Sequence, residues 1–391
     1  MSAVLRGNWN YPTRIWAGPG RILELQAACT AAGIKRPLLV TDEGLVDSEM
    51  IRTALALVPD AALYGNVRGN PSSTHVDAGL AAFRTGRHDG VIAFGGGSAL
   101  DAGKVIAFMS GQSRPLWDFE DVGDWWQRAN PDGIAPIVAV PTTAGTGSEV
   151  GRAGVILNEE THQKKIIFHP KILPQIVILD AKLTVGLPRP VTAATGIDAF
   201  VHCFEAFCAP GFHPMADGIA LEGMRIISAF LPQACDSPND LEARGQMLAA
   251  ASMGATAFQK GLGGVHAIAH PVGSWFNTHH GLTNAILLPY VMIFNRQAIE
   301  TKCATIARLL DLPEPGFDSL FEWVLELRRK LGIAHTLAEI GVTADNAEHI
   351  GREAAADPSA GGNPIAVNAQ QLERIFRAAI VGDLSAATYA P

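Results

Sequence analysis

The sequence predicts an α/β domain followed by an all-helical domain, and three observations carry this prediction. In the first half, short runs rich in Val and Ile alternate with helical stretches, which is typical of a parallel sheet covered on both faces. From about Pro190 onward, long Ala-, Leu- and Met-rich segments with helical periodicity replace these runs. Two prolines interrupt both patterns at L-P-R-P (187–190), which predicts domains over 1–187 and 188–391.

Five strand-like runs are expected in the first half. Helices are expected between them, including residues 74–86 and 98–110. Because ligands bind beyond the carboxyl ends of strands in an open α/β sheet, the turns after these runs are candidate binding loops. The runs are P-L-L-V-T-D (37–42), A-A-L-Y-G-N-V (61–67), G-V-I-A-F-G-G-G-S (90–98), P-I-V-A-V-P-T-T (136–143) and Q-I-V-I-L-D (175–180).

The second half is expected to be helical, with few strand-like runs. From residue 336 on the pattern stays helical, apart from a glycine-rich break at S-A-G-G-N-P (359–364). The segments with helical periodicity are 191–208, 214–230, 240–258, 262–276, 283–298, 300–311 and 316–331.

Composition narrows the possible classes of protein. A length of 391 residues suits two domains, and 48% hydrophobic with 17% charged residues predicts a large core. A net charge of -8 and scattered basic residues argue against non-specific nucleic-acid binding. No signal peptide and no membrane span are expected, because no sufficiently long apolar stretch occurs. Five cysteines without a C-x-x-C spacing indicate reduced thiols in a cytoplasmic protein.

A histidine-rich constellation in the second half has metal-ligand spacing. Residues four apart on a helix share a face, so each spaced pair can direct two side chains at one ion. Nitrogen and oxygen ligands without a thiolate suit Fe(II), Zn(II), Co(II) or Ni(II). For any single histidine, the alternative is a solvated or core-packing role. The constellation comprises Asp198 and His202, then His266 and His270, then His280.

Two glycine-rich loops after predicted strands suit a dinucleotide. Gly96, Gly97 and Ser98 follow a strand and open a helix, where free backbone N–H groups can bind a phosphate, and Asp101 lies on the first turn. The loop 141–149 can hold a nicotinamide ribose or phosphate through its hydroxyl groups. Each loop could also be a plain turn. The hydroxyl-bearing residues of the second loop are Thr142, Thr143, Thr146 and Ser148.

Further cofactor contacts are expected around these loops. Asp42 ends the first predicted strand, where a carboxylate can accept hydrogen bonds from a ribose diol and would repel a 2′-phosphate, which favours NAD over NADP. Asn70 is expected on the adenosine side. Lys164 or Lys165 is expected to reach the cofactor, and Leu183 is assigned to the same site.

Taken together, these features resemble the iron-containing (group III) alcohol dehydrogenase family over nearly the whole chain. The resemblance implies a dinucleotide-binding α/β domain and an all-α C-terminal domain, in the dehydroquinate synthase-like fold, with the site in the cleft between them. The segments that carry it are G-G-G-S-A-L-D-A-G-K (95–104), P-T-T-A-G-T-G-S-E (141–149), the segment 187–202 ending in G-I-D-A-F-V-H, G-x-x-H-A-I-A-H-P-V-G (263–273) and H-G (280–281).

The resemblance also implies roles for single residues. The metal would be Fe(II), or sometimes Zn(II), and four residues would bind it: Asp198, His202, His266 and His280. His270 would not be a ligand; it would lie near the nicotinamide and relay the alcohol proton. The metal would polarise the alcohol oxygen and lower its pKa, and the alcohol carbon would deliver a hydride to NAD. A homodimer or larger homo-oligomer is expected as well.

The chain departs from the commonest family pattern near the expected substrate. Arg152 follows the G-S-E segment, and Lys260 stands where many members have Asn. Two cations beside an apolar pocket would suit a substrate with a distal anion. These segments, with F-H-P (168–170) and A-T-G-x-D-A (194–199), resemble the 4-hydroxybutyrate dehydrogenase branch. The alternative is that both cations are structural or interface charges.

The leading hypothesis is therefore an NAD- and metal-dependent dehydrogenase of a small primary ω-hydroxy acid and its semialdehyde. The first alternative is the same chemistry on a neutral short alcohol or diol, such as a lactaldehyde/propanediol pair. A second is a metal-dependent lyase or synthase of this fold, which would need a denser basic cluster. A third is a non-catalytic metal- or nucleotide-binding protein, which the complete ligand set and His270 argue against.

Overall fold

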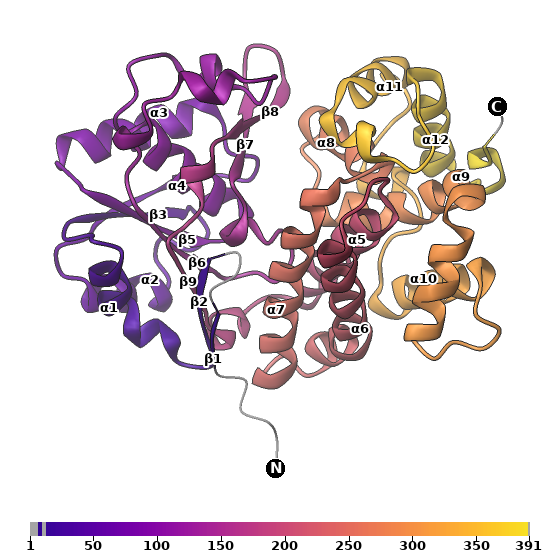
Figure 1. Ribbon diagram of the computed structural model, residues 1–391, viewed down its shortest axis with the longest axis horizontal. Helices are drawn as coiled ribbons and strands as arrows, with labels where there is room; N and C mark the ends of the chain where they lie inside the picture. Colours follow the sequence, from indigo (N-terminus) through magenta and orange to yellow (C-terminus); the bar gives the residue numbers. More distant parts are fainter. Residues whose placement is uncertain (1–6, 10–12, 390–391) are drawn as a thin grey trace. The chain divides into compact units, whose positions relative to one another are not determined.

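The computed structural model describes residues 7–9 and 13–389, which divide into two compact units. The first, the α/β unit, runs to Thr143 and continues over Gly147–Gly186. The second, the helical unit, comprises Ala144–Thr146 and the chain from Leu187 onward. Figure 1 shows strands and helices in the first unit and helices in the second.

Seven strands form the main sheet of the described α/β unit, in the order β1-β2-β9-β6-β5-β3-β4. Every neighbouring pair is parallel except the antiparallel pair of β1 and β2. All residues of β5, β6 and β9 are buried, because helices cover both faces of a parallel sheet. The strands are β1 (Gly7–Trp9), β2 (Arg14–Ala17), β9 (Ile176–Leu179), β6 (Ile137–Pro141), β5 (Gly90–Gly95), β3 (Pro37–Asp42) and β4 (Ala62–Val67).

Helices pack on the two faces of this sheet (Figure 1). Helices α1 (Leu25–Ala31) and α2 (Glu49–Leu57) share a buried apolar cluster with Ile92 and with neighbouring strands. Helix α4 (Gly97–Met109) packs on the other face beside α3 (Ser73–Thr85). A Cβ at Gly103 of α4 would lie 2.8 Å from the Ala93 Cβ, so this glycine lets α4 lie directly on β5.

The five predicted strands of the first half are confirmed, and so is the predicted fold class. The sequence prediction did not name β2 or the separate antiparallel hairpin of β7 (Ala153–Asn158) and β8 (Gln163–Phe168). Only alternate or scattered residues of this hairpin are buried, so its sequence lacks the continuous apolar run that marks the central strands.

In the helical unit, α5 is buried along nearly its whole length. One prediction was wrong: the segments 283–298 and 300–311 are a single helix, α9. The sequence around residue 299 contains no glycine or proline, and Ile299 is buried in the core, so the helix continues through it. The helices are α5 (Arg189–Cys208), α6 (Pro214–Asp236), α7 (Leu241–Ala257), α8 (Gly264–Phe276), α9 (His280–Leu309), α10 (Phe317–Leu331), α11 (Ala347–Ala356) and α12 (Ala369–Val381).

The glycine-rich break at 359–364 corresponds to a short 3₁₀ turn, η10 (Pro358–Gly362), between α11 and α12. Among the described residues, no helix combines the length and apolarity that a membrane crossing requires.

Candidate metal centre

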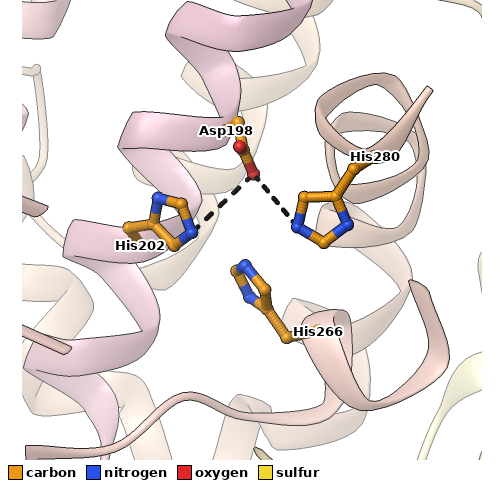
Figure 2. Close-up of side chains that lie close together, drawn as sticks. All are labelled: Asp198, His202, His266 and His280. Atoms are coloured by element: carbon orange, nitrogen blue, oxygen red, sulfur yellow. Dashed lines mark ion pairs between the residues drawn. The ribbon is translucent and has the colours of Figure 1, made fainter. Parts of the chain in front are cut away.

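Four side chains from three helices of the helical unit converge on one point (Figure 2). Asp198 and His202 lie one turn apart on α5, His266 lies on α8, and His280 is the first residue of α9. Their donor atoms all lie within 4.8 Å of one another. The Asp198 Oδ1 is 4.0 Å from the His202 Nε2 and 3.9 Å from the His280 Nε2. This convergence is what the Asp-x-x-x-His spacing and the two later histidines predict.

The geometry and chemistry of the cluster fit a divalent first-row metal ion. Metal–nitrogen and metal–oxygen bonds of about 2.0–2.2 Å keep two ligands of one ion within about 4.4 Å of each other. The four donor atoms are near that spacing already. Three imidazole nitrogens and one carboxylate oxygen suit Fe(II) or Zn(II). Asp198, His202 and His266 are almost completely buried, so an ion between them would be largely shielded from bulk water.

Two glycines let neighbouring helices approach α5 closely beside its ligands. A Cβ at Gly281 of α9 would lie 2.7 Å from the Ala194 carbonyl oxygen of α5 and 3.0 Å from the Asp198 Cβ. A Cβ at Gly254 of α7 would lie 3.0 Å from the His202 Cβ. The glycine of the H-G segment is thus explained by the close approach of α9 to α5 beside the ligands.

The two histidines of the H-A-I-A-H segment meet different partners. His266 faces the cluster. Its pKa is well below the usual value, first because the ring is buried and second because of the charge of His202. The ring therefore stays neutral and can act as a ligand. His270 lies outside the cluster; its ring stacks on that of His280 at a centroid distance of 5.4 Å, and its Nδ1 is 2.8 Å from the Asp357 Oδ2.

The residues expected to bind a cofactor follow the carboxyl ends of strands in the α/β unit. Because these strands are parallel, their carboxyl ends lie at one edge of the sheet. After β4 the chain crosses over β3 to β5, so the strand order reverses between β3 and β5, where open α/β sheets bind ligands. The residues are Asp42 after β3, Asn70 after β4, Gly96, Gly97 and Ser98 after β5, Thr142 and Thr143 after β6, and Leu183 after β9.

Asp42 and the glycine loop lie next to each other at this reversal. Gly95 has a φ of 144°, and a Cβ there would lie 3.0 Å from the Asp42 Oδ2 and 2.8 Å from the Ala99 Cβ. Burial raises the pKa of Asp42, although N–H groups such as that of Gly44, 3.0 Å away, oppose this. The Thr142 N–H donates to the Gly95 carbonyl oxygen at 2.9 Å, which joins the two predicted loops.

Two sequence models of one family together cover most of the chain. "Iron-containing alcohol dehydrogenase" matches residues 12–181, and the C-terminal model of the Fe-containing alcohol dehydrogenase family matches residues 192–380. The chain belongs to the iron-containing alcohol dehydrogenase family. It is therefore an oxidoreductase, and the resemblance inferred from its motifs is confirmed.

Individual relatives agree with this assignment over almost the full length. A 4-hydroxybutyrate dehydrogenase from Cupriavidus necator is 36% identical over 378 residues, which are 94% of this chain and 98% of the relative. A 1,3-propanediol dehydrogenase from Klebsiella pneumoniae is 35% identical over 93% of this chain and 96% of the relative. A crystal structure of a 1,3-propanediol oxidoreductase, 34% identical, superposes with a TM-score of 0.89 and covers 97% of this chain and all of its own.

Within this family fold, Asp101, a predicted cofactor contact, also has partners inside the α/β unit. Its carboxylate accepts hydrogen bonds from the Ser148 hydroxyl at 2.6 Å and the Val155 N–H at 3.1 Å, and it pairs with the Lys104 ammonium at 3.1 Å. The buried Lys104 ammonium also donates to the carbonyl oxygens of Ser148 and Ala153. These contacts fasten the hydroxyl-rich loop and the start of β7 to α4.

Lys260, the second predicted substrate contact, has partners within the protein. Its side chain is 2% exposed, and its ammonium pairs with Asp217 at 2.5 Å and donates to the Phe207 carbonyl oxygen at 3.2 Å. The cation therefore caps the end of α5 and is already neutralised by a carboxylate. Arg152 is exposed, with its guanidinium 5.6 Å from the centroid of the Phe168 ring.

The remaining predicted contacts lie on loops and on the hairpin. Lys165 forms an ion pair with Glu120 at 3.2 Å, whereas Lys164 on β8 stays the predicted cofactor contact. Thr146 belongs to the short segment that groups with the helical unit, while Ser148 belongs to the α/β unit.

The sequence prediction missed three polar residues beside the cluster: Glu205, Asn284 and Asp357. A Glu205 carboxylate oxygen lies 2.6 Å from the His266 Nδ1, within hydrogen-bond distance. The Asn284 amide donates to the Asp198 Oδ1 at 2.7 Å. Burial raises the pKa of Glu205 to about 7, opposed by N–H donors that include Val265. A detectable sign existed, because Glu205 and Asn284 lie three and four residues after His202 and His280, within mainly apolar stretches of α5 and α9.

Proposed function

We propose that the chain is a metal-dependent, NAD(H)-linked dehydrogenase that interconverts a small primary ω-hydroxy acid, such as 4-hydroxybutyrate, and its semialdehyde. The buried cluster of one aspartate and three histidines is the observation that carries the proposal, with Asp198, His202, His266 and His280 as the metal ligands. When bound there, Fe(II) or Zn(II) supplies Lewis-acid polarisation of the alcohol or carbonyl oxygen.

The chain's own residues would then hold the ion and move the proton. Asp198 adds one negative charge to three neutral imidazoles, which suits a dipositive ion. His270 would take up the alcohol proton at Nε2, because its Nδ1–H is donated to Asp357 and leaves Nε2 as the acceptor. Burial raises the pKa of Asp357, but the charge and the hydrogen bond of His270 lower it by more. The pKa of Asp357 is therefore below its usual value, and this side chain stays a carboxylate.

The α/β unit would bind the nicotinamide cofactor at its carboxyl edge. The N–H groups at the start of α4, next to Gly96, Gly97 and Ser98, suit a diphosphate. Asp42 would accept hydrogen bonds from the adenosine ribose, which favours NAD over NADP. The other proposed cofactor contacts are Asn70, Thr142, Thr143, Thr146, Ser148, Lys164 and Leu183.

The acid specificity rests on Arg152 and on the similarity to a 4-hydroxybutyrate dehydrogenase. The test is NADH formation at 340 nm by the Fe(II)-reconstituted protein, with 4-hydroxybutyrate and 1-butanol compared. We expect a kcat/KM advantage of about tenfold for the acid, worth about 1.4 kcal/mol, and its loss in Arg152→Ala. Lys260→Met is the matched control, because that ammonium is engaged with Asp217 and should not affect the preference for acid.

A neutral diol is the second candidate substrate. The similarity to 1,3-propanediol dehydrogenases favours it, as does the pairing of Lys260 with Asp217, because a cation already paired with a carboxylate attracts an anionic substrate less strongly. A higher kcat/KM for 1,3-propanediol than for 4-hydroxybutyrate, unchanged in Arg152→Ala, would replace the acid with the diol while keeping the same chemistry.

We also propose that the protein works in the cytoplasm as a homodimer or larger homo-oligomer. All five cysteines are buried thiols outside any disulfide, which suits a reducing compartment. Light scattering coupled to size-exclusion chromatography measures the oligomeric state directly.

A further inference from the structure

Glu205 joins two of the helices that carry the metal-site residues. It lies on α5, three residues after His202 and seven after Asp198, so all three side chains share one helical face. Its side chain is 4% exposed. One carboxylate oxygen accepts from the Val265 N–H at 2.8 Å, and the other lies 2.6 Å from the His266 Nδ1, within hydrogen-bond distance. Glu205 therefore contacts the first turn of α8 through both the backbone and the histidine side chain.

This contact depends on a glycine just before α8. A Cβ at Gly263 would lie 2.9 Å from the Glu205 Oε1, closer than real Cβ atoms approach other atoms. The backbone of Gly263 is extended, which any residue can adopt, so the requirement here is space. The glycine three residues before His266 thus has a physical reason, since it lets the carboxylate reach the start of α8.

The hydrogen bond to Nδ1 determines what the other ring nitrogen of His266 can do. A neutral imidazole carries one N–H, and a carboxylate can only accept it. With the hydrogen on Nδ1, Nε2 carries a lone pair. That atom faces the cluster, 3.1 Å from the Asn284 amide nitrogen that also contacts Asp198. Carboxylates that hold metal-ligating histidines in this way fix the tautomer and make the imidazole a better donor.

We propose that Glu205 is the positioning residue of the metal centre, which fixes His266 as the Nδ1–H tautomer so that Nε2 is available to the ion. This inference rests on the proposed metal site. A structural alternative exists, because the same carboxylate caps the N-terminus of α8 through Val265. The experiment therefore has to separate the cap from the hydrogen bond to the histidine.

The variant Glu205→Gln separates them. Glutamine keeps an oxygen that can accept from the Val265 N–H, but its amide nitrogen would donate to the His266 Nδ1 and move the ring hydrogen to Nε2. We expect Zn(II) affinity, measured by competition with a chromophoric chelator, to fall about 10- to 100-fold. The thermal unfolding midpoint of the metal-free protein should change little. Anaerobic titration with Fe(II) should also show weaker binding to Glu205→Gln than to the wild type.

Asp357→Asn is the matched control, because it reverses the equivalent hydrogen bond at His270, which lies outside the ligand cluster. Its Zn(II) affinity should equal that of the wild type. Equal Zn(II) affinity of Glu205→Gln and the wild type would overturn the inference, and so would equal losses in both variants. Failure of the wild type to bind Zn(II) or Fe(II) would instead overturn the proposed metal site itself.

A measurement on the wild type keeps the inference testable if Glu205→Gln does not fold. In metal-free protein labelled with ¹⁵N-histidine, long-range ¹H–¹⁵N spectra report which ring nitrogen of His266 carries the hydrogen. We expect Nδ1 to be protonated and Nε2 to be bare. A hydrogen on Nε2 would overturn the inference.

Discussion

His266 and His270 show that two histidines on the same helical face can have different roles. They lie one turn apart on α8, and each Nδ1 faces a carboxylate, yet only His266 belongs to the cluster of donor atoms. The difference comes from the position of each ring relative to α5 and α9 and not from any property of the histidine. A His-x-x-x-His pair therefore predicts one shared face, and tertiary packing decides which member reaches an ion.

Asp357→Asn should lower kcat about 100-fold, as expected when a general base loses its acceptor nitrogen. Asparagine can still accept the Ser359 N–H that now bonds to Asp357, so the turn η10 should persist. The amide would donate to the His270 Nδ1 and place the hydrogen on Nε2. Steady-state NADH formation with metal content measured in parallel tests this, and a kcat within twofold of the wild type at full metal loading would remove His270 from the proton path.

At the scale of elements, buried ionic contacts hold the loops of the α/β unit in place. Lys104 is 1% exposed and contacts Asp101 and two carbonyl oxygens, so a single ammonium connects α4, the loop after β6 and the start of β7. A buried charge is tolerated only when its hydrogen bonds are satisfied, and here both carbonyl acceptors belong to a loop or a strand end that the helix must hold.

Lys104→Met should therefore destabilise the protein by about 3 kcal/mol, because it leaves Asp101 without its cation and two carbonyl oxygens without this donor. The midpoint of urea unfolding measures the loss. Adding Asp101→Asn should recover part of it, since the uncompensated carboxylate is then removed. If the double variant is as unstable as the sum of the two single variants, the ion pair is not the source of the effect.

Across the whole molecule, the features that were predicted best from the sequence are those that depend on local periodicity. Central strands such as β5 are apolar throughout because both faces are buried, and α5 places Asp198 and His202 on one face by helical geometry alone. The hairpin of β7 and β8 was missed because it is only partly buried.

The contacts that the sequence did not indicate at the site have a different cause, which is pairing between residues far apart in the chain. Lys260, a predicted substrate contact, pairs with Asp217, 43 residues earlier. Glu205 and His266 are 61 residues apart, and His270 and Asp357 are 87 apart. No local pattern indicates which buried acid meets which base, since that depends on how the helices pack.

Metal binding should stabilise the three helices that supply the ligands, which are α5, α8 and α9. The four ligands come together only in the folded protein, so an unfolded chain has no such site. At 100 times its Kd, an ion that binds only the folded state contributes about 2.7 kcal/mol. Zn(II) should therefore slow hydrogen exchange in these three helices, while chelation should reverse the effect and the exchange of β5 and β6 should stay unchanged. His202→Ala removes one ligand and should abolish the protection. Equal protection in that variant would mean that the ion binds elsewhere.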